Sequence, residues 1–176
     1  MLEALKQKLP GRILSENTFL GELVIEIGKE NLFESLSFLL NKGYQVLIDL
    51  TGVDYIDPTP RTKIVYLLHN PLNYERIRVF TFAAREERIP SVTQLWAGAN
   101  WYERELYDLF GIQFEGHLGL KRILMPDDWK GHPLRKDYPL TEEPVEFKHG
   151  VKPKLPSEII PHVKTTIGNT THVKNY

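Results

Sequence analysis

The chain has 176 residues, and its 22 Lys and Arg against 23 Asp and Glu leave a formal charge of −1. This length allows one domain with roughly 50 residues to spare, and the near-neutral charge gives no bulk electrostatic reason to bind nucleic acid or an acidic membrane surface. The sequence contains no cysteine, which excludes disulfides, thiolate catalysis and iron–sulfur ligation by cysteine.

The first elements alternate between helix and strand. The spacing of Leu2, Leu5 and Leu9 predicts a short amphipathic helix that ends near Gly11. The apolar and β-branched run that follows predicts a strand over 22–27.

A second helix and three further strands are predicted next. An apolar stripe over 32–40 predicts a helix that Gly43 ends. The run 44–50 predicts a strand, and the strand–helix–strand order favours a parallel, right-handed crossover from the preceding strand. The runs 64–68 and 77–82 predict an antiparallel pair, because the turn residues between them are too few for a crossover. The prediction is an α+β fold whose mixed sheet has about four strands flanked by helices.

Two helical pieces, or one bent helix, are predicted before Gly111. Ser91 can cap the first piece with Gln94 in capping-box position, and Asn100 can cap the second with Glu103. Helical spacing divides the second piece into an inward and an outward face. The inward face carries Tyr102, Leu106, Leu109 and Phe110, and the outward face carries Trp101, Glu105 and Asp108.

Residues 126–176 are predicted to form an extended, partner-wrapping tail after a domain over 1–125. Hydrophobic periodicity fails in this part, and it contains seven of the chain's 12 prolines. Its charges are nearly balanced, so the prolines, not charge repulsion, account for the extended form.

The charged cluster of Glu103, Arg104, Glu105 and Asp108 has three interpretations. Its spacing favours a solvated helix face with an i,i+4 pair between Arg104 and Asp108. The second interpretation is an interface with another protein. The third pairs Glu105 with Asp108 as the general acid and base of a hydrolase, although no nucleophile, glycine-rich phosphate loop or metal triad accompanies them.

The histidines lack the spacing of a metal site. His117 can pair with Glu115 or with a carboxylate of the helix. His132 precedes Pro133, which favours an extended backbone at the histidine. Both histidines are expected to be structural or interfacial.

The segment 131–140 combines a restricted backbone with groups suited to recognition. Arg135 offers bidentate binding of a carboxylate, and Leu134 and Tyr138 offer apolar anchors. Binding by wrapping around a partner therefore competes with a disordered loop. The run 50–55 is expected to be only a strand end with a turn, and no ligand is assigned to it.

A longer pattern connects these residues. It begins with Glu-Arg-Glu and continues through an acid, an apolar pair, a His or Lys, a basic position and a final apolar pair. The positions are filled by Glu103-Arg104-Glu105, Asp108, Leu109-Phe110, His117, Lys121 and Ile123-Leu124. Together with the runs 49–55, 122–129 and 131–139, this pattern resembles the family of the 30-kDa subunit, also called the C subunit, of proton-pumping NADH:quinone oxidoreductase, respiratory complex I.

The resemblance implies a cofactor-free subunit in the hydrophilic peripheral arm of that complex. Its partners would be the 49-kDa subunit and neighbouring iron–sulfur subunits, and flavin, iron–sulfur clusters and quinone would be held by partner subunits. No apolar run in the sequence is long enough to cross a bilayer. We therefore expect a peripheral membrane protein, attached only through its complex, on the cytoplasmic side of the inner membrane, or on the matrix side in a mitochondrion.

The expected site is a partner interface, with no catalytic, cofactor-binding or metal residue and no nucleic-acid partner. The residues expected at this interface are Glu103, Arg104, Glu105, Asp108, His117, Lys121, Arg122, His132, Pro133, Arg135, Lys136, Asp137 and Tyr138. The alternative is the equivalent subunit of a ferredoxin-, F420H2- or hydrogenase-linked membrane complex. The alternative from another class is an independent hydrolase using Glu105 and Asp108.

Overall fold

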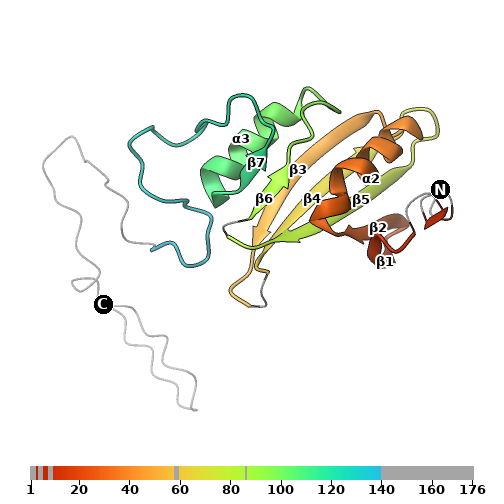
Figure 1. Cartoon of the computed structure of the whole chain (residues 1–176), viewed down its shortest axis with the longest axis horizontal. Coiled ribbons are helices and arrows are strands. Elements are labelled where there is room, and N and C mark those ends of the chain that lie inside the picture. Colours follow the sequence, from red (N-terminus) through yellow and green to blue (C-terminus); the bar gives the residue numbers. More distant parts are fainter. Residues whose placement is uncertain (1–2, 4–5, 8–9, 58–59, 86, 140–176) are drawn as a thin grey trace, which may run out of the picture. The chain divides into compact units, whose positions relative to one another are not determined.

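A mixed five-stranded sheet forms the framework of the domain (Figure 1). The computed structural model describes residues 3, 6–7, 10–57, 60–85 and 87–139. The strands of this sheet are β1 (Ile13–Phe19), β2 (Glu22–Ile27), β3 (Val46–Asp54), β4 (Thr62–His69) and β5 (Arg76–Ala83). They lie in the order β1-β2-β5-β4-β3, in which β2 and β5 are parallel and the other neighbours are antiparallel.

The sheet confirms the predicted strands and corrects their arrangement. The antiparallel pair is present as β4 and β5, and β2 and β3 point the same way, as the crossover prediction requires. β5 and β4 nevertheless lie between β2 and β3, so these two strands are not neighbours. The sequence prediction also missed β1, because six of its seven residues are exposed and carry little apolar periodicity.

A second, smaller sheet joins two distant parts of the chain. Its strands, β6 (Arg88–Pro90) and β7 (Gln113–Glu115), are parallel and only three residues each. Neither was predicted, because three residues are too few to show a period. β6 precedes the helix at Ala99–Phe110 and β7 follows it, so their pairing holds the chain after this helix beside the chain before it.

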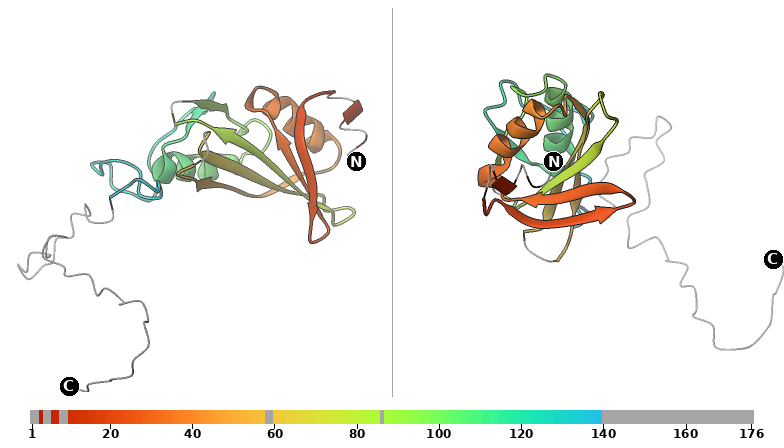
Figure 2. Two further views of the ribbon diagram at one scale, coloured as in Figure 1. Left: turned by 90° about the horizontal axis from the view of Figure 1, so that it is seen from below. Right: turned by 90° about the vertical axis from the view of Figure 1, so that its right-hand side faces the viewer.

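Two helices cover the same side of the large sheet (Figure 2). α2 (Lys29–Asn41) buries Leu32, Leu36 and Leu39 against the sheet, and α3 (Ala99–Phe110) packs mainly on β3. Gly43 follows α2 with a φ of 98°, a left-handed conformation, as predicted for a helix end. The core combines aliphatic side chains with buried aromatic rings, among which Tyr66 is 0 % exposed.

The helical piece expected to begin at Ser91 is absent, because that segment forms turns. The Ser91 side chain forms hydrogen bonds with Thr93 and not with Gln94, so the predicted capping box does not form. The Ser91 backbone N–H donates to the carbonyl of Glu115 at 2.8 Å. The second piece is present as α3 and ends at Gly111 as expected, but it begins at Ala99 with Gly98 as its N-cap, so the prediction that Asn100 caps it is wrong.

Parts of both ends of the chain lie outside the described residues. The helix expected around Leu2, Leu5 and Leu9 rests on residues outside the described part, and so do residues 140–176 of the expected tail. Residues 126–138 belong by their contacts to the same compact unit as the domain. None of the described helices is long and apolar enough to cross a bilayer.

Candidate functional site: the anchored segment after helix α3

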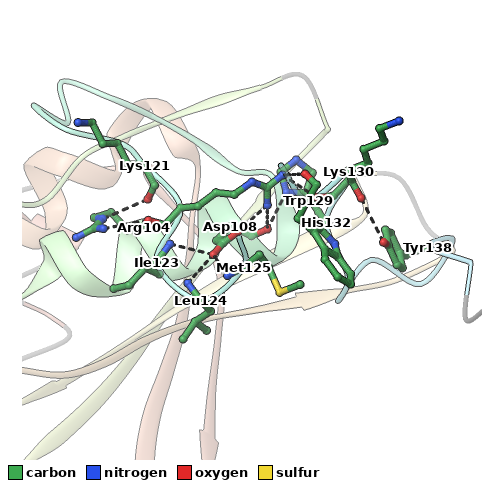
Figure 3. A network of polar contacts seen from close by, with 12 residues as sticks. Arg104, Asp108, Lys121, Ile123, Leu124, Met125, Trp129, Lys130, His132 and Tyr138 are labelled. Atoms are coloured by element: carbon green, nitrogen blue, oxygen red, sulfur yellow. Dashed lines mark hydrogen bonds and ion pairs between the residues drawn. The ribbon is translucent and has the colours of Figure 1, made fainter. Parts of the chain in front are cut away.

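A buried carboxylate on α3 organises the chain that follows the helix (Figure 3). The Asp108 side chain is 0 % exposed and accepts a hydrogen bond from Arg122 Nη1 at 2.6 Å. Its second oxygen accepts the consecutive backbone N–H groups of Ile123, Leu124 and Met125 at 3.0, 2.7 and 2.8 Å. Asp108 therefore fixes the start of residues 121–138, which we call the anchored segment.

The environment of Asp108 keeps it ionised. Burial alone would raise its pKa, but the three N–H groups and Arg122 outweigh burial and lower the pKa to about 2. The predicted pair with Arg104 does not form, because Arg104 donates to the backbone carbonyls of Lys121 and Arg122 at 3.2 and 3.0 Å. Asp108 also does not face outward, whereas Trp101 and Glu105 do.

The anchored segment then satisfies the last carbonyls of α3. His132 Nδ1 lies 2.9 Å from the carbonyl oxygen of Asp108, the Leu134 N–H donates to Leu109 at 3.0 Å, and Arg135 Nε donates to Phe110 at 2.6 Å. Helix ends leave such carbonyls without helical partners. Arg135 therefore caps a helix within its own chain through Nε, a use that the sequence did not suggest.

Gly111 allows this close approach. Its φ of 75° lies in the left-handed region, and a Cβ at this position would sit 2.6 Å from His132 Cδ2 and would also collide with the guanidinium of Arg135. Only a glycine fits both the backbone conformation and the space.

A second buried carboxylate holds the far end of the anchored segment. Asp54, the last residue of β3, is 4 % exposed and accepts Arg61 Nε and Nη2 at 2.8 and 2.6 Å. It also accepts the backbone N–H of Lys136 at 2.7 Å. Asp137 pairs in turn with Arg61 and Arg85. Burial opposes the charge on Asp54, but the Arg61 and Lys136 hydrogen bonds prevail and lower its pKa.

Asp54, Arg61 and Arg85 were missed as members of this cluster. The run 50–55 is the end of a strand, as expected, because β3 ends at Asp54, but the acid at that end has a definite partner. A carboxylate that ends an apolar strand was the available signal. Its partners in the anchored segment lie about 80 residues later, beyond the reach of a local pattern.

Glu103 contrasts with Asp108 on the same helix. It is 0 % exposed, and its Oε1 accepts the Val92 N–H at 2.7 Å, but Oε2 finds no hydrogen-bond partner among the described residues. The hydroxyl of Tyr66, also fully buried, finds none there either. Burial raises the pKa of Glu103 to about 7, and its hydrogen bonds to Val92 and Ser91 only partly offset that rise.

The remaining interface candidates are internal in part. His117 accepts the Gly119 N–H on Nδ1 at 3.0 Å instead of pairing with Glu115, and the Tyr138 hydroxyl donates to the Lys130 carbonyl at 3.2 Å. Most of the predicted residues are therefore brought together around α3 and the anchored segment. The side chains of Glu103 and Asp108 are enclosed in the chain itself.

Other side chains on α3 and on the chain after it are exposed. They include those of Trp101, Glu105, Leu118, Lys121 and Leu124. Trp101 is 59 % exposed with the Arg104 guanidinium 5.2 Å from its ring centre, and Leu118 is fully exposed. We call these five residues the outer face.

The site does not have the arrangement of an acid–base pair. Asp108 is closed off by Arg122 and three N–H groups, so it cannot exchange a proton with a substrate beside the exposed Glu105. The hydrolase interpretation is therefore wrong for this pair. Within the described ranges, no group of three or more His, Asp or Glu could hold a metal ion.

Comparisons with known proteins agree on one family. The family described as "Respiratory-chain NADH dehydrogenase, 30 Kd subunit" matches residues 25–144. The C subunit of NADH-quinone oxidoreductase from Roseiflexus castenholzii is 43% identical over 151 residues, which cover 84% of this chain and 87% of the relative. NADH-quinone oxidoreductase subunit 5 of Thermus thermophilus is 43% identical over 145 residues, covering 77% and 70%.

Two solved structures resemble the domain. A trypsin-resistant fragment (1–134) of Nqo5 is 36% identical with a TM-score of 0.60, covering 68% of this chain and 96% of that one. A chain of the membrane-bound sulfane sulfur reductase, an archaeal respiratory membrane complex, has a TM-score of 0.71 at 23% identity, covering 79% and 84%. The second likeness shows a shared fold and no more.

Proposed function

The chain belongs to the 30-kDa subunit family of respiratory-chain NADH dehydrogenase, and on that premise we propose that it is a non-catalytic structural subunit in the peripheral arm of an NADH:quinone oxidoreductase. There it supports electron transfer from NADH to quinone, coupled to proton translocation. Relatives named for NADH-quinone oxidoreductase favour this complex over a ferredoxin-, F420H2- or hydrogenase-linked one.

The observation that carries this proposal is the internal use of the motif charges. Asp108 and Arg122 hold the anchored segment on α3, and Arg104 holds it through backbone carbonyls. These groups shape a surface, and their bonds within the chain leave them unsuited to act as an acid, a base or a nucleophile. The outer face, with an exposed tryptophan and two exposed leucines, has the composition of a docking surface.

Cofactors and partners follow from the same proposal. The 49-kDa subunit and the neighbouring iron–sulfur subunits are the partners, and flavin, iron–sulfur clusters and quinone are held by partner subunits. The lack of cysteine supports the absence of a cluster in this chain. The chain reaches the membrane through the complex, on the cytoplasmic side of the inner membrane or on the matrix side in a mitochondrion.

Co-purification with the complex tests the outer face. Trp101→Ala should weaken association by about 2 kcal/mol, roughly thirtyfold, because a tryptophan at the centre of an interface carries much of the binding energy. The measurement is the amount of this chain retained on an NADH:quinone oxidoreductase that is tagged on another subunit. Ile56→Thr, at a residue 69 % exposed outside the outer face, is the matched control.

Two results would contradict different parts of the proposal. Wild-type chain that never accompanies NADH:quinone oxidoreductase activity would overturn the function itself. Full retention of the Trp101→Ala chain would remove the outer face from the interface and leave the function standing.

A separate deletion tests the predicted tail. Removing residues 141–176 should loosen the chain from the 49-kDa subunit if the tail wraps that partner. Undiminished association would contradict the wrapping.

A further inference from the structure

A second apolar surface lies at the other end of the large sheet from Asp54. The turn at 20–21 precedes β2 and the loop 70–75 precedes β5, and because β2 and β5 are parallel neighbours, the two connections lie at the same sheet end. Leu20, Leu72 and Tyr74 on these connections are 89 %, 83 % and 80 % exposed, and Phe19 beside them is 54 % exposed. We call these four side chains the sheet-end patch.

The patch borders a hollow of about 410 Å³. Leu20 and Tyr74 stand at its rim, and Leu23, Tyr44, Glu75 and Arg76 also line it. Tyr44 is only 2 % exposed, and its hydroxyl donates to Glu75 Oε2 at 3.0 Å. The two exposed connections therefore border an open recess, in which the Tyr44 hydroxyl bonds the Glu75 carboxylate.

Both rim residues have left-handed backbone conformations. Leu20 has a φ of 51° and Tyr74 a φ of 61°, and these are the only non-glycine residues with positive φ in the part of the chain that the structure describes. A two-residue hairpin turn with positive φ favours Asn, Asp or Gly, because a larger L side chain is strained there. The chain instead places large apolar side chains in strained positions where water surrounds them, an arrangement that neither folding nor solubility favours.

The charges at the recess indicate what the occupant carries. Glu22 is paired with Arg78 at 3.2 Å and with Arg76 at 3.9 Å. Glu75 forms no ion pair within the described ranges, and its only side-chain partner there is the Tyr44 hydroxyl. A Lys or Arg of the occupant would form an ion pair with Glu75. An anionic lipid surface would be repelled by the same carboxylate.

We propose that the sheet-end patch is a second docking site, which takes an apolar segment bearing a Lys or Arg from another subunit of the same assembly. The inference rests on the proposed function, since it requires a fixed neighbour. It adds a contact at the sheet end opposite the anchored segment, so the subunit is held at two places.

Leu20→Asn separates docking from folding. Asparagine adopts the left-handed region more readily than leucine, so the free full-length variant should unfold at a higher temperature than wild type. The same variant should associate about ten- to a hundredfold more weakly with the complex, because it removes one buried leucine from the contact. Leu14→Asn, at a residue 62 % exposed near the other end of the same hairpin, should leave association unchanged.

Photo-crosslinking identifies the occupant. With p-benzoylphenylalanine at position 74 in the assembled complex, we expect a crosslink to an apolar peptide of another subunit with a Lys or Arg near the crosslinked residue. Glu75→Gln should make that association weaker and less sensitive to salt.

The outcomes distinguish this inference from the proposed function. A complex that contains the chain but yields no crosslink, or a crosslink to lipid or to a second copy of the chain, overturns the second docking site alone. Unchanged association of Leu20→Asn also overturns it. A chain that never enters the complex overturns the proposed function first.

Discussion

Two acids on α3, five positions apart, have pKa values that are shifted in opposite directions. Glu103 and Asp108 are equally inaccessible to water, so burial disfavours the charge on each. Asp108 accepts hydrogen bonds from the Arg122 side chain and from three backbone N–H groups. The pKa of Glu103 is lowered only by the Val92 N–H and the Ser91 side chain. The number of donors therefore decides that Asp108 is fully ionised at neutral pH, whereas about half of the Glu103 carboxyls keep their proton.

Asp108→Asn should destabilise the domain by about 3 kcal/mol, because it leaves Arg122 without a counter-charge and turns an amide donor toward backbone donors. Chemical denaturation of the full chain at pH 7 measures this loss. The ordinary pKa of 3.8 falls to about 2 in the folded domain, so Asp108 stabilises the fold above pH 3.8, and this contribution of about 2 kcal/mol disappears as the pH falls toward 2. An acid-unfolding curve identical to that of Asp108→Asn would contradict the assignment.

Glu103→Gln should change the stability of the domain at neutral and alkaline pH instead of at acidic pH. The pKa of Glu103 rises from 4.5 to about 7 on folding, so its contribution to stability is complete below pH 4.5 and is lost as the pH rises through 7. At pH 8 the glutamine variant should be more stable than wild type by up to about 3 kcal/mol, with little difference at pH 4.5. Thermal unfolding across this range measures the effect, and Glu105→Gln, at an exposed position of the same helix, is the control substitution.

At the scale of elements, the end of α3 depends on a single glycine. Gly111→Ala should cost about 2–3 kcal/mol, since the left-handed backbone is strained and the methyl group displaces His132 and Arg135 from the helix carbonyls. Gly98→Ala is the matched control, because its φ is −63° and a Cβ there meets nothing within 4 Å. Denaturation midpoints compare the two, and trypsin should cleave the anchored segment faster only in Gly111→Ala.

The elements that the sequence predicted are those with a repeating apolar pattern. The helix stripe over 32–40 and the strand runs at 64–68 and 77–82 point their side chains into one core, and the structure confirms them as α2, β4 and β5. β1 has no such stripe, because it is a polar edge strand, and its turn at Leu20 uses a residue that the turn chemistry disfavours.

The candidate site was predictable in location but not in its bonds. The motif residues do gather around α3. Their side-chain partners, however, are distant: the Glu103 carboxyl accepts from Val92, eleven positions earlier, and the Asp108 carboxylate accepts from residues up to 17 positions later. The i,i+4 rule could therefore only propose Arg104 for Asp108, because helical spacing contains no information about a segment that folds back from beyond the helix.

For the whole molecule, the two buried carboxylates define how much chain the domain needs. A fragment ending at residue 139 should still unfold in one cooperative transition, as the full chain does, because the contacts of Asp54 and Asp108 are all retained. A fragment ending at residue 131 should be clearly less stable, since it lacks the groups that cap α3. Denaturation of the three chains measures this, and equal stability of the shorter fragment would contradict the anchoring role of 132–138.

The strand order also determines the sequence in which strands can pair while the chain is being synthesised. The hairpin of β1 and β2 is made first, but the strand that β2 pairs with, β5, follows about 50 residues later, a delay of roughly 3–10 s at the usual elongation rate of about 5–20 residues per second. β3, β4 and β5 form a local meander and can pair as they emerge. The N-terminal hairpin is therefore the last part of the sheet to be joined to it, and until then β2 has an unpaired edge that can pair with another chain.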